Sequence, residues 1–168
     1  MVKFLQQTKD DYLTQQSDRT NVVKWSLDAA FAVHPNMKSH TGAVMTMGKG
    51  AVQSASTKQK VNTRSSTEAE LVLVDDIIAK ILWTKRFLEA QGYLMQNTAN
   101  TVVYRDNTSA MKLKNNRKAS SGKRTRHLDI KFFYITDLIQ RKLLRTEYCN
   151  TDSMVSDYMT KPLIGQKF

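Results

Sequence analysis

Hydrophobic and polar positions repeat with two different periods along this chain, and the short period marks the strands. Residues 22–28 (VVKWSLD) mix β-branched, aromatic and alternating positions and end on an acid, which is typical of a strand. Residues 42–57 have the pattern of two strands around the tight turn Gly48-Lys49-Gly50, so a hairpin is expected there. Residues 101–106 (TVVYRD) are a short apolar run that again ends on an acid, and residues 143–149 predict a last strand.

The longer, helical period occupies the segments between these strands. A long helix is expected over 67–92, capped by Ser65, Ser66 or Thr67 and ended by Gly92. Further helices are expected directly after Asp106, over 127–142 and over 153–161, with a marginal leading helix within 1–20. The order β-β-β-α-β-α-α-β-α predicts an α/β fold with a mixed sheet and helices on its faces.

Composition and charge narrow the class of partner. The 168 residues suit one domain, and 26 Lys and Arg against 15 Asp and Glu give a net charge of +11. The window 112–145 holds eleven Lys and Arg and only two acids, and its densest part is the polar loop KNNRKASSGKRTR. This loop predicts binding of a phosphate backbone, ahead of a role in solubility alone. The single Cys149 excludes a disulfide framework, and no stretch predicts a signal peptide or a membrane helix, so an intracellular protein is expected.

Four acids stand where an active site of this fold class would form. Asp28 and Asp106 end predicted strands, Glu68 opens the long helix, and Asp157 lies in the last short helix. Ligands of open α/β sheets collect beyond the carboxyl ends of strands, and clustered carboxylates suit a hard cation such as Mg²⁺ or Mn²⁺. Each acid taken alone is better explained as a helix cap or a solvated surface residue.

Local sequence motifs point to a known family. In chain order they are LDAAFA at 27–32, STKQK at 56–60, SSTEAE at 65–70, YRDNTSA at 104–110, KRTRHLDI at 123–130 and SDYMTKPL at 156–163. Together they resemble the ribonuclease H domain of copia-type (Pseudoviridae) retrotransposon polyproteins, over roughly 22–163. Residues 1–20 are similar to the tail of the preceding reverse-transcriptase region, which leaves 21–168 as the ribonuclease H domain.

The resemblance implies a ribonuclease H-like fold, with a five-stranded sheet of three antiparallel and then helix-separated parallel strands, and helices on both faces. It implies hydrolysis of the RNA strand of an RNA–DNA hybrid during reverse transcription, by two Mg²⁺ ions for which Mn²⁺ can substitute. Asp28, Glu68, Asp106 and Asp157 match the catalytic, metal-binding acids. The implied partners are the hybrid and the reverse-transcriptase domain, without a membrane, in a cytoplasmic virus-like particle or the nucleus; the sequence carries no signal for an oligomeric state.

Residues beside these acids are expected to bind the nucleic acid. Some of them match strand-gripping positions of the family, and the others lie in the basic loop or at the start of the next helix. The set is Thr63, Arg64, Ser65, Asn107, Thr108, Ser109, Lys118, Lys123, Arg124 and His127. For His127, a polar helix cap and a substrate contact are equally good interpretations. Lys161 is expected either to touch phosphate or to be solvated.

Two alternatives accompany this interpretation. A non-catalytic hybrid-binding or connection module of the same fold is the alternative function, although such degeneration would normally remove some of the acids. The second alternative concerns the helix acid. A helical wheel places Glu70, not Glu68, on the stripe of Leu73, Val74 and Ile77. The family motif favours Glu68, and the hypothesis carried forward is that Glu68 holds metal.

Overall fold

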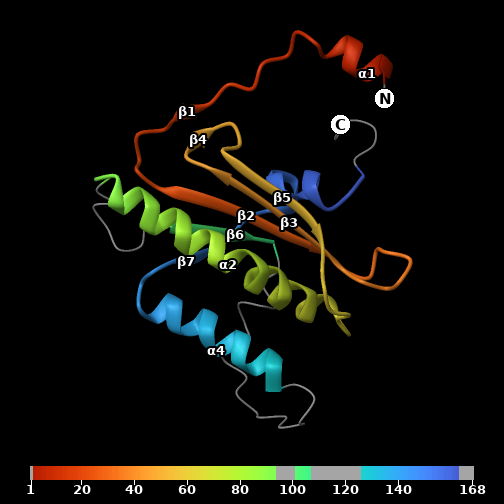
Figure 1. Cartoon of the computed structure of the whole chain (residues 1–168), viewed down its shortest axis with the longest axis vertical. Helices are drawn as coiled ribbons and strands as arrows, with labels where there is room; N and C mark the ends of the chain where they lie inside the picture. The colour runs from red at the N-terminus through yellow and green to blue at the C-terminus, as the bar shows by residue number, and fades with distance from the viewer. Residues whose placement is uncertain (1, 94–100, 107–125, 163–168) are drawn as a thin grey trace.

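A mixed five-stranded sheet forms the centre of the molecule. The computed structural model describes residues 2–93, 101–106 and 126–162. The sheet has the order β5-β3-β2-β6-β7, from the strands β2 (Val23–Ala30), β3 (His40–Thr46), β5 (Gln53–Lys58), β6 (Thr101–Arg105) and β7 (Arg145–Tyr148). The first three pair antiparallel, whereas β6 runs parallel to β2 and β7 parallel to β6 (Figure 1). The predicted sheet is therefore confirmed.

Two long helices and two short 3₁₀ turns pack with the sheet in the part of the chain that the structure describes. Helix α2 (Ser66–Ala90) runs across the sheet, and α4 (Arg126–Gln140) lies beside it (Figure 1). The predicted last helix is instead two 3₁₀ turns, η1 (Thr151–Ser153) and η2 (Val155–Met159), and η2 packs on β2 and β3. The helix expected after Asp106 lies outside the described residues. No helix in the described part of the chain is long and apolar enough to span a membrane.

The central strand β2 separates two kinds of packing. Val23, Trp25 and Leu27 are fully buried in the main hydrophobic cluster, together with apolar residues of α2. Side chains alternate across a strand, so Ser26 and Asp28 point to the opposite face. There the Ser26 hydroxyl lies 3.0 Å from the Ser156 hydroxyl of η2. The helices thus cover an apolar face of the sheet, and η2 covers the face on which β2 presents Ser26 and Asp28.

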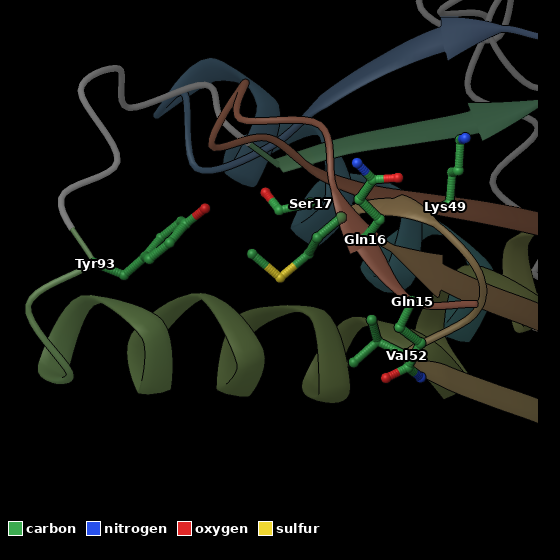
Figure 2. A pocket seen from close by; sticks show the side chains of 7 residues that line it. Gln15, Gln16, Ser17, Lys49, Val52 and Tyr93 are labelled. Atoms are coloured by element: carbon green, nitrogen blue, oxygen red, sulfur yellow. The ribbon is translucent and has the colours of Figure 1, made fainter. Parts of the chain in front are cut away.

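The N-terminal segment is mostly extended. Helix α1 is short (Val2–Gln7), and Tyr12 and Leu13, expected on a leading helix, are exposed. Strand β1 (Gln16–Ser17) pairs antiparallel with β4 (Gly48–Lys49), at the tip of the predicted hairpin. A groove of about 270 Å³ follows this junction and is lined by Gln15, Gln16, Ser17, Met47, Lys49, Val52 and Tyr93 (Figure 2). The assignment of 1–20 to a preceding region stays a prediction.

Candidate active site

Two of the four expected acids meet because their strands are parallel neighbours. Ser26 of β2 pairs with Tyr104 of β6, and Asp28 and Asp106 each lie two residues further along. Both side chains therefore reach the carboxyl end of the sheet on the same face. This is the edge where ligands of open α/β sheets bind.

The third acid of the cluster comes from α2 and is Glu70. Carboxylate oxygens of Asp28, Glu70 and Asp106 all lie within 4.8 Å of one another. Asp28 is only 3% exposed and Glu70 only 4%, whereas Asp106 is partly exposed, so two of the three acids are buried. Oxygens this close, without a histidine or cysteine, suit a hard divalent cation of the Mg²⁺ or Mn²⁺ type. The donor set therefore fits a metal site.

The expected helix acid, Glu68, lies elsewhere. The Ser65 hydroxyl caps α2 by accepting a hydrogen bond from the Glu68 amide at 3.2 Å. The Glu68 carboxylate turns back along the chain and accepts a hydrogen bond from the Arg64 amide at 2.8 Å. This is a variant of the capping box, in which the third helical residue satisfies a backbone amide at the helix start. Residues two positions apart on a helix point about 200° away from each other. The helix rotation that places Glu70 in the cluster therefore directs Glu68 away from it. The expected placement of Glu68 is thus corrected in favour of Glu70.

A buried arginine fixes the orientation of Glu70. Arg105, the last residue of β6, donates a hydrogen bond to one Glu70 carboxylate oxygen at 2.8 Å, and both side chains are almost fully buried. The backbone amide of Ala29 donates to the other oxygen at 3.2 Å. Charged hydrogen bonds of this kind constrain both partners strongly. Sequence reasoning missed Arg105, although a charged residue inside an apolar strand was a signal that could have indicated it.

The fourth expected acid, Asp157, approaches the cluster from η2. It is outside the group of three, but Lys161 joins it to that group. The Lys161 ammonium lies 3.0 Å from an Asp157 oxygen and 3.6 Å from an Asp28 oxygen. The Thr160 hydroxyl also donates a hydrogen bond to Asp28. The Ser56 hydroxyl donates to the Met159 carbonyl at 2.7 Å, which ties this turn to β5.

The electrostatics of the cluster follow from burial and crowding. Burial raises the pKa of the Asp28 carboxyl above its ordinary value, and the charges of Asp157 and Asp106 add to this effect. Burial likewise raises the pKa of Glu70, although the Arg105 charge opposes it. Crowded acids with raised pKa values favour any added cation, because the cation stabilises their charged forms.

The expected nucleic-acid contacts are only partly within the described residues. Thr63, Arg64 and Ser65 lie just before α2, and the Thr63 hydroxyl hydrogen-bonds that of Ser39 at 2.8 Å. His127 is in the first turn of α4. The remaining members, Asn107, Thr108, Ser109, Lys118, Lys123 and Arg124, lie outside the described residues. The binding roles of the whole set stay predictions.

Sequence relatives agree with the motif-based interpretation. No protein-family model matches the chain. The chain is 32% identical over 133 residues to the retrovirus-related Pol polyprotein from transposon TNT 1-94 of Nicotiana tabacum, which covers 79% of the chain and 10% of that protein. It is 32% identical over 130 residues to the Pol polyprotein from transposon RE1 of Arabidopsis thaliana, covering 77% of the chain and 9% of the relative. The chain thus spans about a tenth of the length of these relatives.

Solved structures agree with the fold. LC11-RNase H1, isolated from compost, superimposes with a TM-score of 0.57 at 14% identity, covering 83% of this chain and 93% of its own. The same enzyme in complex with an RNA/DNA hybrid gives a TM-score of 0.53 at 13% identity, covering 82% and 92%. The protease-reverse transcriptase of prototype foamy virus gives 0.54 at 13% identity, covering 88% of this chain and 21% of its own. The chain therefore belongs to the copia-type retrotransposon Pol polyproteins, of which it spans about a tenth, and it has the ribonuclease H fold.

Proposed function

We propose that this chain hydrolyses the RNA strand of RNA–DNA hybrids by two-metal catalysis. The observation that carries the proposal is the convergence of Asp28, Glu70 and Asp106 from β2, α2 and β6. We propose Mg²⁺ as the physiological ion, held by these three residues and by Asp157. When bound, such a pair of ions would activate a water molecule and stabilise the leaving oxygen of the phosphodiester.

The chain's own residues supply orientation. Arg105 and the Ala29 amide hold the Glu70 carboxylate from two sides, so its free lone pairs face Asp28 and Asp106. Thr160 holds Asp28 through its hydroxyl. Preorganised charged groups of this kind lower the barrier, because no reorganisation is needed during the reaction. Thr63, Arg64 and Ser65, which lie just before the first turn of α2, are proposed to grip the nucleic-acid backbone.

The hybrid substrate and the reverse-transcriptase partner are part of the same proposal. A structural neighbour binds an RNA/DNA hybrid, and another is a protease-reverse transcriptase. The relatives are Pol polyproteins, in which this region is one segment. We propose that the chain acts beside the reverse-transcriptase region of its own polyprotein, in a virus-like particle or the nucleus.

A cleavage assay on an end-labelled RNA–DNA hybrid tests the proposal. Cutting is expected with Mg²⁺ or Mn²⁺ and none with EDTA, whereas RNA and DNA duplexes should stay intact. Asp28→Asn and Glu70→Gln should each lower the rate by about 100-fold or more, because each removes a charge at the reacting centre. Glu68→Gln is the matched control: the same chemical change on the same helix should keep most of the activity. Loss of cleavage in Glu68→Gln with full activity in Glu70→Gln would transfer the role back to Glu68.

A specific observation favours a second candidate function. The Arg105 and Lys161 cations already pair with three of the four acids. A hybrid-binding module without catalysis would keep such ion pairs as permanent structural contacts. Hybrid binding that persists in EDTA, with no cleavage in either metal, would establish this alternative.

A further inference from the structure

Two cations within the described residues, Arg105 and Lys161, contact the acid cluster, and they differ in how firmly they are held. The Arg105 side chain is 6% exposed and pairs with Glu70, itself 5% exposed, so it cannot leave without opening the core. The Lys161 side chain is 42% exposed, although its partners Asp28 and Asp157 are 5% and 11% exposed. A lysine ammonium is a compact charge on a flexible four-carbon stem and is easily rehydrated. The cluster thus combines one fixed and one movable cation.

The position of Lys161 follows from the local backbone. The amides of Thr160 and Lys161 both donate to the Asp157 carbonyl, at 3.1 and 3.0 Å. This turn brings Lys161 back over Asp157, four residues earlier, and places its ammonium between Asp157 and Asp28. The ammonium therefore lies within ion-pair distance of both acids.

One ammonium cannot neutralise two carboxylates. Among the residues that the structure describes, Lys161 supplies a single positive charge to Asp28 and Asp157, which leaves this pair of acids with a net negative charge. A divalent cation would balance both acids, and the released ammonium would regain water at little cost because it is already half exposed. Exchange of the lysine for the metal is therefore favourable in charge, and the exposed lysine is readily rehydrated.

We infer that Lys161 is a displaceable counter-ion, which holds Asp28 and Asp157 together before metal binds and is displaced when a divalent cation enters. The inference rests on the proposed function only in that these acids take part in metal binding. Lys161 acts through Asp28 and Asp157, so it is a positioning residue. It follows that the lysine competes with the metal, and changes at position 161 should alter metal affinity in opposite directions.

Calorimetric titration of the full chain with Mn²⁺ at mildly alkaline pH tests this competition. Lys161→Met removes the competitor and should tighten Mn²⁺ binding by roughly fivefold, the scale expected of a half-exposed ion pair. Lys161→Arg introduces a cation that holds carboxylates more firmly, and it should weaken binding by a similar factor. The matched control is Lys131→Met, which breaks the 2.8 Å ion pair with Asp75 between α4 and α2 and should leave the affinity unchanged.

Melting temperature gives a second measurement. Without metal, Lys161→Met should melt below the wild type, and Mn²⁺ should restore more stability to it than to the wild type. Wild-type protein that binds no Mn²⁺ would overturn the proposed metal site itself. Wild-type binding together with equal or weaker binding in Lys161→Met, or with equal or tighter binding in Lys161→Arg, would overturn the role of Lys161 alone.

Discussion

The two faces of the central sheet stabilise the molecule in different ways. On the helix-covered face, Trp25 and Leu27 of β2 pack in a continuous apolar cluster with Leu73, Ile77 and Ile81 of α2. On the η2-covered face, the same strand presents Ser26 and Asp28. Apolar burial is nondirectional and contributes mainly free energy of folding. Hydrogen bonds and ion pairs depend on geometry and set the direction of side chains. The helix-covered face therefore supplies apolar burial, and the η2-covered face orients Asp28 and Asp157.

The η2-covered face depends on close backbone approach. Gly42 of β3 pairs with Asp28, and a Cβ atom at Gly42 would lie 2.4 Å from the Thr160 methyl group and 3.0 Å from Met159 and the Ser156 carbonyl. Only glycine leaves room for the turn that carries Thr160 to Asp28. Small residues at this contact therefore have a positional role, in contrast to the large side chains on the helix-covered face.

The largest expected effect on stability comes from the helix-covered face. Leu27 is fully buried, so Leu27→Ala should lower the free energy of unfolding by about 3 kcal/mol, through lost burial and the cavity that remains. Denaturant unfolding measures this loss. The matched control is the neighbouring residue on the other face: Ser26→Ala removes hydroxyl contacts to Met154 and Ser156 and should cost only about 1 kcal/mol. Equal losses would erase the distinction between the faces.

Gly42→Ala is expected to lower the free energy of unfolding by less than Leu27→Ala does, and to weaken metal binding as well. The added methyl group must push η2 and Thr160 outward, at a cost of about 2 kcal/mol, and this movement separates Asp157 from Asp28. Mn²⁺ titration should show weakened binding. Gly92→Ala makes the same chemical change at the end of α2, where the backbone φ of +73° is strained for alanine but the surrounding space is open. The Gly92→Ala variant should be less stable but bind Mn²⁺ with unchanged affinity. If Gly92→Ala also weakened Mn²⁺ binding, the weaker binding of Gly42→Ala would be attributed to general destabilisation.

The smallest effect on stability is expected from pH. Burial raises the pKa values of Asp28 and Glu70 above their ordinary 3.8 and 4.5, so the folded chain holds protons that the unfolded chain has released. The free energy of unfolding of the metal-free chain is therefore highest when the pH is below the ordinary pKa values. It falls as the pH rises through the raised pKa values of Asp28 and Glu70. Mn²⁺ affinity should change with the opposite sign and increase with pH, because the ion must displace these protons. Thermal melts with and without Mn²⁺ across this range measure both trends, and a metal-free chain that becomes more stable through the same window would contradict them.

Much of the fold was accessible from local sequence patterns. The strand patterns of 22–28 and 101–106, the hairpin around Gly48 and a helix cap within 65–67 each depend on neighbouring residues, and the structure confirms them, with Ser65 as the cap. The meeting of Asp28 and Asp106 was also predictable, because parallel neighbouring strands present their ends at one edge of a sheet. The last segment was predicted as a helix, but packing against β2 and β3 accommodates only short 3₁₀ turns there.

The tertiary structure decided which acids and cations face one another. Glu68 and Glu70 have the same chemistry and differ by two positions, and only the rotation of α2 against the sheet makes one a cap and the other a member of the cluster. Arg105 and Lys161 each pair with an acid that is distant in the chain, Glu70 at 35 residues for Arg105 and Asp28 at 133 residues for Lys161. Helical periodicity determines which residues share a face, but the direction in which that face points depends on packing between elements distant in the chain.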